Sequence, residues 1–311
     1  MYEDGEGVPQ DYKKAVYWHH AAAEQGNVKS QHNLGGHYYN GNGVSQNYEQ
    51  AFYWYLKAAE QGGAGSQYTV ALMYSKGRGV ARDYDRALEW YKKAAHQGDA
   101  ESQYSIGWMY YEGEGVPQSY EQALDWYHKS ATLGFAMAQH NLGLMFHKGE
   151  GVEQNFKKAF YWISLAAEQG EAFAQRFLGA MYQDGEGTTA DYKLALYWFQ
   201  KAAEQGDADA QFRLGWMHFN GEGTPKNNAE AIIWIEKSAR AGDALSQYVL
   251  GFLYEIDREQ TWSQETIAYW YERSAKQGIA MAQLKLGWRY HEGKGVLKSD
   301  RQAYIWFSLK Q

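Results

Sequence analysis

The chain has 311 residues, which is enough for two ordinary domains or one long extended domain. It has no cysteine, so disulfides and thiolate metal sites are excluded, and its formal net charge of -7 is spread along the chain, which argues against a nucleic-acid-binding surface. An apolar run of about 18 residues, the length that suggests a membrane-spanning helix, does not occur, so membrane insertion is not expected.

A repeat of 36 residues runs along the whole chain, and positions 36 residues apart form what we call a column. The tryptophan column comprises Trp18, Trp54, Trp90, Trp126, Trp162, Trp198, Trp234, Trp270 and Trp306. The glutamine column comprises Gln31, Gln67, Gln103, Gln139, Gln175, Gln211, Gln247 and Gln283. Glycine pairs begin at Gly5, Gly41, Gly77, Gly113, Gly149, Gly185, Gly221 and Gly293, and the only empty slot is Asp257.

The first residues of the chain align with the end of a first helix of a repeat, called helix A. Tyr2 shares a column with Tyr38, and Met1 shares one with Met73, so most of the first helix A is expected to be missing. At the other end, residues 306–311 (WFSLKQ) stop before the Ala-Ala pair of a second helix, called helix B. Both ends are therefore expected to be truncated, and the chain predicts no compartment, whether periplasmic, secreted or cytoplasmic.

Helix B of each repeat is predicted from its start signal and its periodicity. Its N-cap column contains only Asp, Asn and Ser, whose side-chain oxygens accept from free backbone N–H groups. These residues are Asp11, Asn47, Asp83, Ser119, Asn155, Asp191, Asn227, Ser263 and Ser299. Over residues 48–62 (YEQAFYWYLKAAEQG) apolar residues recur three or four apart, and the closing Gly62 is expected to cap the helix. The tryptophan column lies in helix B and is predicted to be core.

Helix A is predicted over stretches such as residues 100–113 (AESQYSIGWMYYEG). Gln103, Ile106, Gly107 and Tyr110 form its inner stripe, and the small Gly107 is expected to let the partner helix approach closely. Each repeat is therefore expected to be a pair of helices joined by a glycine turn.

These residues carry a family resemblance. The stretch LGLMFHKGEGVEQNFKKAFYWISLAAEQG, residues 142–170, resembles the Sel-1-like repeat, a relative of the tetratricopeptide repeat, and the match covers essentially the whole chain. The resemblance implies an all-α fold, a right-handed α/α superhelical solenoid of tandem antiparallel helix pairs over residues 1–311, with the A helices lining a concave surface. It also implies a protein-binding scaffold and no enzyme.

The turn DGEGVPQDY, residues 4–12, imitates a calcium loop or a dinucleotide-binding loop. The column of Asp4 also contains Lys76 and Lys148, and lysine cannot ligate calcium. A dinucleotide fingerprint would need a third glycine where Gln10 stands and a preceding strand. The positive φ that glycine allows predicts a structural turn between helices.

Catalytic and metal motifs are also missing. None of the serines begins the S-x-x-K motif of β-lactam-binding enzymes, and the ten histidines form no H-E-x-x-H motif. A β-lactamase-like hydrolase is therefore the disfavoured alternative. No cofactor, no metal site and no catalytic residue is expected.

The face of helix A opposite its inner stripe is expected to face the groove, and we call it the groove face. It is mostly polar in the early repeats and becomes apolar later. The predicted partner-binding residues are Trp108, Phe173, Phe177, Trp216, Leu245, Val249, Phe252, Ile256 and Trp288. Arg176, Arg213 and Lys285 are expected to help set the register of the bound partner.

The eighth repeat, residues 243–278, has the longest apolar stripe on this face and lacks the glycine turn. Residues 257–262 (DREQTW) replace it, and Trp262 stands in a column that otherwise contains Gln, Arg, Lys or Ala. The stripe is either a partner site or is covered by the altered loop, by another subunit or by a missing C-terminal segment.

The sequence thus predicts a scaffold or adaptor that binds another protein or a peptide in its groove. A finer alternative is a bacterial immunity, envelope or host-interaction protein that sequesters a specific effector, such as a toxin. End-to-end self-association is a further possibility, and nucleic acid is not an expected partner.

Overall fold

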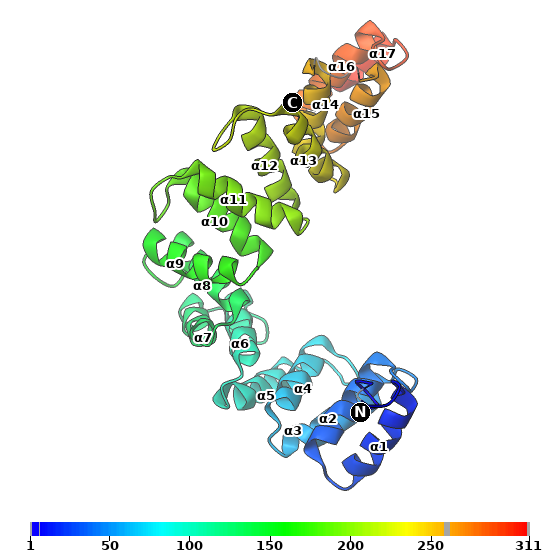
Figure 1. The fold of residues 1–311 in the computed structure, drawn as a ribbon, viewed down its shortest axis with the longest axis vertical. Coiled ribbons are helices and arrows are strands. Elements are labelled where there is room, and N and C mark those ends of the chain that lie inside the picture. Colours follow the sequence, from blue (N-terminus) through cyan, green and yellow to red (C-terminus); the bar gives the residue numbers. More distant parts are fainter. Residues whose placement is uncertain (1, 6, 258–261, 310–311) are drawn as a thin grey trace. The chain divides into compact units, whose positions relative to one another are not determined.

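The computed structural model describes residues 2–5, 7–257 and 262–309, and these residues form seventeen α-helices and no strand (Figure 1). The first eight helices are α1 (Tyr12–Glu24), α2 (Val28–Asn40), α3 (Tyr48–Glu60), α4 (Ala64–Lys76), α5 (Tyr84–His96), α6 (Ala100–Glu112), α7 (Tyr120–Thr132) and α8 (Ala136–Lys148). The others are α9 (Phe156–Glu168), α10 (Ala172–Asp184), α11 (Tyr192–Glu204), α12 (Ala208–Asn220), α13 (Asn228–Arg240), α14 (Ala244–Ile256), α15 (Gln264–Lys276), α16 (Ala280–Glu292) and α17 (Asp300–Ser308).

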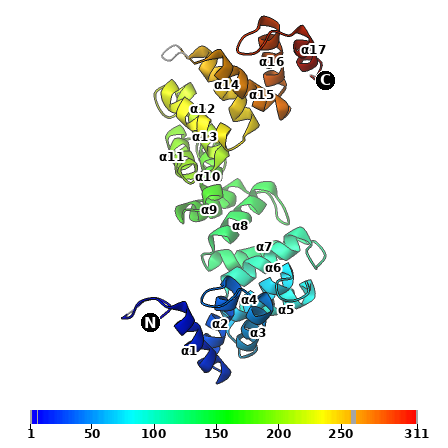
Figure 2. The same cartoon turned by 90° about the vertical axis from the view of Figure 1, so that its right-hand side faces the viewer.

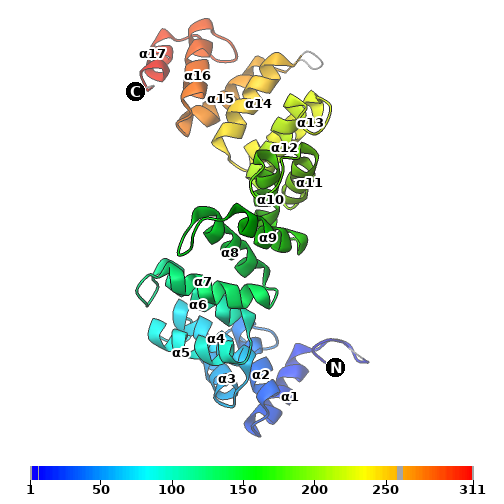
Figure 3. The ribbon, with the colours of Figure 1, turned by 90° about the vertical axis from the view of Figure 1, so that its left-hand side faces the viewer.

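The chain divides into two compact halves, an N-terminal half (Met1–Asn155) and a C-terminal half (Phe156–Gln311). Within each half, helices that follow one another in sequence pack together, as Figures 2 and 3 show for α12 with α13 and for α15 with α16. Even-numbered helices are the predicted A helices and odd-numbered helices the B helices. The predicted all-α fold of tandem helix pairs is confirmed, and its extent as one domain over residues 1–311 stays a prediction.

The N-cap column starts the B helices as expected. In α3, for example, the side chain of Asn47 accepts from the backbone N–H of Gln50, and in α5 that of Asp83 accepts from Arg86. The same bond occurs at Asp11, Ser119, Asp191, Asn227, Ser263 and Ser299. One orphan donor at the start of each of these helices is thereby satisfied.

The two glycines of the turn between helices A and B each have a structural role. Gly149 ends α8 with φ +76° and Gly151 follows with φ +68°, a region that strains other residues. Gly151 also approaches the start of α7, where a Cβ would lie 2.6 Å from the carbonyl carbon of Tyr120. The first glycine therefore terminates helix A, and the second permits contact with the helix B of the preceding repeat.

Helix A and helix B of one repeat meet at the glycine of the inner stripe. A Cβ on Gly107 would lie 2.7 Å from the Tyr127 ring, so the predicted close approach is confirmed. Tyr127, Phe199 and Tyr271, which occupy one column, are fully buried at this contact. The largest core side chains therefore come from the column directly after the tryptophans.

The prediction that the tryptophan column is core is wrong for most of its members. Trp54 and Trp270 are buried, but Trp18 is 60% exposed. The other six are half-buried, namely Trp90, Trp126, Trp162, Trp198, Trp234 and Trp306. The neighbouring column takes the core position, and lysines cover several indole faces from the solvent side, as Lys93 covers Trp90 at 3.8 Å.

The glutamine column joins consecutive repeats through buried hydrogen bonds. Gln175 in α10 donates from Nε2 to the carbonyl of Ala167 in the preceding α9, at 3.2 Å. Its Oε1 accepts from Gln205 at the end of α11, at 2.8 Å. The same two bonds occur at Gln31, Gln67 and Gln247. One buried amide therefore links three helices.

Replacing Gln175 by leucine is expected to lower the free energy of unfolding by about 1 to 2 kcal/mol, because the Ala167 carbonyl and the Gln205 amide each lose one of their two hydrogen bonds, and keep only those to Gly170. Urea titration followed by circular dichroism would measure this change. The matched control is Gln200→Leu on the exposed face of α11, where the change should stay within about 0.5 kcal/mol. Equal losses in the two variants would contradict a role for the buried amide.

The eighth repeat departs from the others at the end of its helix A. α14 ends at Ile256, and its C-cap Asp257 is extended where the other A helices have a left-handed glycine. Trp262 stacks on Tyr254 with a ring separation of 3.7 Å and donates its indole N–H to Asp257. Residues 258–261 of the segment DREQTW (257–262) lie outside the described residues. The off-register Trp262 thus packs against the end of α14.

Candidate functional site

The predicted partner-binding residues all lie on A helices, and they differ in exposure. Trp108 (α6), Phe173 (α10), Leu245 and Ile256 (α14) and Trp288 (α16) are exposed. Phe177 (α10), Trp216 (α12) and Phe252 (α14) are half-buried. Val249 (α14) is only 5% exposed, so the expectation that it lies on an open face is wrong.

The burial of Val249 has a physical cause in its neighbours. Val249 belongs to a core cluster with Leu250 and Leu253, and the half-buried rings of Trp216 and Phe252 pack against that cluster. Aromatic side chains from two successive A helices therefore cover part of the stripe. Its two ends, Leu245 and Ile256, stay exposed.

In the N-terminal half, Trp108 lines two cavities on the groove face. One has a volume of about 290 Å³ and the other about 170 Å³. We call six of the apolar and aromatic residues that line them the Trp108 surface: Tyr68, Leu72, Trp108, Phe135, Met137 and Leu144. Leu72, Met137 and Leu144 lie in columns of the predicted groove face. Tyr68 and Phe135 lie in other columns, so the sequence pattern did not predict that they line this surface.

The polar groups around the Trp108 surface are mainly acidic carboxylates and neutral phenols. Glu101 and Glu114 line the larger cavity together with Lys76, and Glu112 lines the smaller one. Burial, together with nearby tyrosine and acidic side chains, raises the pKa of Tyr68 to about 12. One of these acidic groups is Glu101, to which the Tyr68 hydroxyl donates a hydrogen bond, so the phenol oxygen can still accept one.

Tyr111 is held in place beside this surface. Its hydroxyl donates to Glu150 at 2.8 Å, and its ring lies 6.4 Å from that of Trp108. Burial, and then the hydrogen bond to Glu150, raises the pKa of Tyr111 well above its usual range. A rigid neutral phenol therefore supports the indole of Trp108 from one side.

In the C-terminal half, a cavity of about 270 Å³ opens beside Trp216. It is lined by Gln183, Asp209, Phe212, Arg213, Trp216, Asp243 and Leu245. Trp216 stacks on Phe212 with a ring separation of 6.2 Å and contacts Phe219 at 5.5 Å. The cavity therefore has an aromatic wall and a charged rim.

The three basic residues predicted to set the register already form ion pairs within the chain. Arg176 bonds Asp207 at 3.2 Å and Asp209 at 2.9 Å. Arg213 bonds Asp209 at 3.3 Å, and Lys285 bonds Glu255 at 2.7 Å. A partner would have to share these cations with their carboxylates, so their role in register stays a prediction.

Among the described residues, no helix is both long enough and apolar enough to span a membrane. The groove face offers apolar rings, neutral hydroxyls and paired charges. This chemistry suits the binding of a chain segment that carries apolar side chains.

Comparison with known proteins identifies the repeat. The family model described as Sel1 repeat matches residues 1–27, 28–63, 64–99, 100–135, 136–171, 172–207, 208–243, 244–279 and 280–309. No curated protein matches the chain.

Two solved structures are similar over most of the chain. One is a protective antigen of uropathogenic Escherichia coli with an SLR fold, which is 40% identical with a TM-score of 0.86. The match covers 99% of this chain and 66% of the antigen, so the chain spans just under two thirds of that protein. The other is a Sel1 repeat protein from Oxalobacter formigenes, 31% identical with a TM-score of 0.70, which matches over 94% of this chain and 85% of its own.

Proposed function

The chain belongs to the Sel1 repeat family, and from this membership we propose that it is a non-enzymatic scaffold that binds a segment of another protein on the groove face of its A helices. Sel1 repeats typically mediate protein–protein interaction and are generally not catalytic. The proposal concerns the binding surface and the chemistry of the segment that it accepts.

The observation that carries the proposal is the Trp108 surface. Trp108 is 39% exposed although it is a large aromatic residue, and cavities of about 290 and 170 Å³ adjoin it. Exposed aromatic residues beside pockets are frequent energetic centres of interfaces, because a partner side chain buries apolar area in the pocket. The Trp216 cavity in the C-terminal half has the same character and would bind in the same way.

The charge around the Trp108 surface indicates the composition of the partner. Glu101, Glu112 and Glu114 outnumber the single Lys76 among the residues that line its cavities. A segment with aliphatic or aromatic residues flanked by lysine or arginine would complement this rim. The phenol oxygen of Tyr68 would accept a hydrogen bond from a backbone N–H of that segment.

Selection from a displayed library of random peptides is expected to enrich peptides that combine apolar residues with lysine or arginine. Trp108→Ala should weaken binding of the selected peptides by about 30-fold, which corresponds to the 2 kcal/mol of an interface hot spot. The matched control is Tyr53→Ala, which removes an exposed aromatic ring from the B helix α3. Fluorescence anisotropy of the labelled peptides would measure both affinities.

Two outcomes would contradict the proposal. One is the absence of any enriched peptide, and the other is an equal loss of affinity in the Trp108 and Tyr53 variants. Incubation with β-lactam substrates tests the enzyme alternative, for which no turnover is expected.

Among the finer roles, an envelope or host-interaction protein has the best support, since the 40% identical structure is a protective antigen. An immunity protein that sequesters an effector would be expected to stay inside the producing cell. Cleavage by a protease added outside intact producing cells would separate the two roles.

A further inference from the structure

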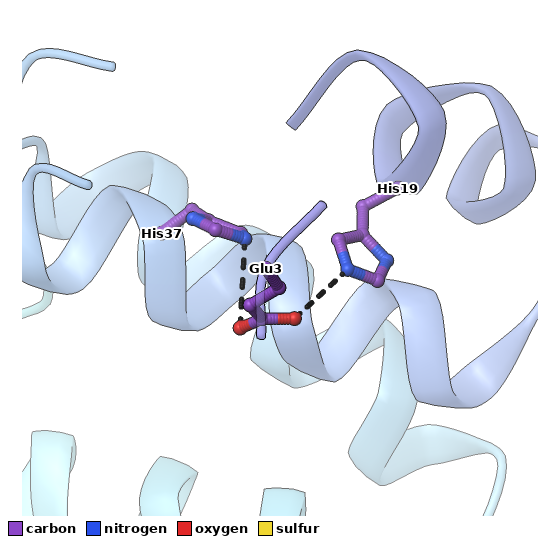
Figure 4. A group of neighbouring side chains, drawn as sticks. All are labelled: Glu3, His19 and His37. Carbon is purple, nitrogen blue, oxygen red and sulfur yellow. Dashed lines mark hydrogen bonds and ion pairs between the residues drawn. The ribbon is translucent and has the colours of Figure 1, made fainter. Parts of the chain in front are cut away.

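Three potential metal ligands gather where the first repeat meets the second, away from the groove residues described above. Glu3 precedes α1, His19 lies on α1 and His37 lies on α2, and Figure 4 shows the carboxylate of Glu3 between the two imidazole rings. Glu3 Oε2 lies 3.2 Å from His19 Nε2, and Glu3 Oε1 lies 3.8 Å from His37 Nε2. The three ligand atoms lie within 4.8 Å of one another.

His37 is oriented with its free nitrogen toward the carboxylate. The residue is 3% exposed, and its Nδ1 lies 2.9 Å from the backbone carbonyl oxygen of Asn42. Because a carbonyl only accepts, Nδ1 carries the proton, and in a neutral ring Nε2 then carries a lone pair. Nε2 is buried and has no hydrogen-bond partner among the described residues. Metal-binding histidines typically donate the N–H of their other ring nitrogen to a carbonyl or carboxylate, which orients the ring.

The repeat shows that both histidines replace apolar or aromatic core residues. The column of His37 contains Met73, Met109, Met145, Met181, Met217, Leu253 and Arg289. The column of His19 contains Tyr55, Tyr91, Tyr127, Ile163, Phe199, Ile235, Tyr271 and Phe307. The helix pair does not need imidazole at either position, so two histidines that meet here require another explanation.

The same three columns come together again where the eighth repeat meets the ninth, and there one of them contains a cationic side chain. Glu255 stands in the column of Glu3, Tyr271 in that of His19 and Arg289 in that of His37. Glu255 accepts from the hydroxyl of Tyr271 at 3.0 Å and from the guanidinium of Arg289 at 3.2 Å. The fold therefore brings a carboxylate and two side chains together at both places. At the junction of the first two repeats, His37 stands in place of that arginine.

We propose that Glu3, His19 and His37 bind a divalent transition metal ion, for which Zn²⁺ is the best match. Two imidazole nitrogens and one carboxylate oxygen are a common zinc ligand set, whereas Ca²⁺ and Mg²⁺ prefer oxygen alone. Tetrahedral zinc places its ligands about 3.3 Å apart, so the observed separations need only a modest contraction. Water completes the coordination from the adjoining cavity of about 570 Å³, which Glu3 and His19 line.

The metal ion fastens the segment before α1 to the first two helices. Glu3 comes from that segment, and the two histidines come from the adjacent helices α1 and α2. A bound ion therefore raises the free energy needed to detach this segment, and metal binding is coupled to the order of the first repeat.

Isothermal titration of the metal-free 311-residue chain with Zn²⁺ tests the proposal, with His37→Met and His19→Tyr as the main variants. Both substitutions restore a residue of the column and should preserve the fold. The wild-type chain should bind one Zn²⁺ at this site, and each variant should weaken that binding by at least about 100-fold, since changes behind the ligands alone cost about 10- to 100-fold. The matched control is His32→Tyr, which also restores a column residue and should leave zinc affinity unchanged.

Two further readouts keep the test independent of any one variant. Co²⁺ in the wild-type chain should give the visible absorption of a tetrahedral site, and Glu3→Gln should change that spectrum while circular dichroism stays constant. Zn²⁺ should raise the melting temperature of the wild type and not that of His37→Met. The proposal is overturned if zinc does not bind, or if His19→Tyr, His37→Met and His32→Tyr all bind it as the wild type does.

Discussion

Replacing Gly151 by alanine is expected to lower the free energy of unfolding of the N-terminal half by about 3 kcal/mol, because two penalties add at this glycine. Its φ is +68°, where a residue with a Cβ costs about 1 to 2 kcal/mol. The new Cβ would also lie 2.7 Å from the carbonyl oxygen of Tyr120, and overpacking costs about 1 to 3 kcal/mol. Urea titration followed by tryptophan fluorescence would measure the loss.

The matched control for this prediction is Gly134→Ala. Gly134 has φ +90°, but among the described residues no atom lies within 4 Å of where its Cβ would be. Only the backbone penalty of about 1 to 2 kcal/mol should remain. If both substitutions destabilised the chain equally, the contact between the glycine turn and the start of α7 would contribute nothing.

Replacing Glu255 by alanine is expected to lower the free energy of unfolding of the C-terminal half by about 2 kcal/mol. The side chain of Arg289 is only 5% exposed, and Glu255 is the carboxylate that pairs with it. Loss of one partner of a buried pair costs about 3 to 5 kcal/mol, but Glu255 itself is 35% exposed, so solvent screening reduces the effect. Thermal or urea unfolding of the variant would measure it.

A second substitution should rescue the Glu255 variant. Arg289→Met introduces the residue found at six other positions of this column, and it removes the cation that Glu255→Ala leaves buried. The double variant is therefore expected to recover most of the lost stability. A double variant that is less stable than Glu255→Ala would show that the arginine stabilises the repeat independently of its carboxylate.

The ion pair between Glu255 and Arg289 also predicts that the stability of the chain depends on pH. Burial acts to raise the pKa of Glu255, but hydrogen bonds from Lys285 and Tyr271 and the charges of Lys285 and Arg289 lower it below its ordinary value of 4.5. A carboxyl group whose pKa is lowered by folding contributes stability above its unfolded pKa, and the contribution disappears as pH falls through the folded pKa. The difference in stability between wild type and Glu255→Gln should therefore shrink as the solution is acidified below pH 4.5.

Much of the fold was predictable because each structural signal recurs in every repeat, so a weak signal at one position is supported by the same signal at the others. One N-cap such as Asn47 is weak evidence for a helix start, but nine good caps in a single column determine it. The same comparison between repeats identified Gly151 as part of a turn and rejected a ligand loop. Each column therefore carries information that a single repeat does not.

The candidate site was less predictable, because exposure depends on neighbours from other repeats. Val249 lies on the groove face by its spacing, yet it is buried in a core cluster against which Trp216 and Phe252 pack. The prediction that the tryptophan column is core was wrong for a related reason. Periodicity places Trp90 and Tyr91 near each other, and only packing decides which of the two side chains enters the core. The group of Glu3, His19 and His37 was missed because a local motif cannot join residues from three separate segments.

The glutamine links described above also bear on how such a chain can change its length. Gln175 bonds only to the end of the preceding helix B and to the helix B of its own repeat. Duplication or deletion of one whole 36-residue repeat therefore again places a helix B carbonyl before each glutamine, as Ala167 stands before Gln175 and Ala95 before Gln103. Insertion of one more whole repeat should therefore preserve these hydrogen bonds, so the number of repeats can change without loss of the contacts between neighbouring repeats.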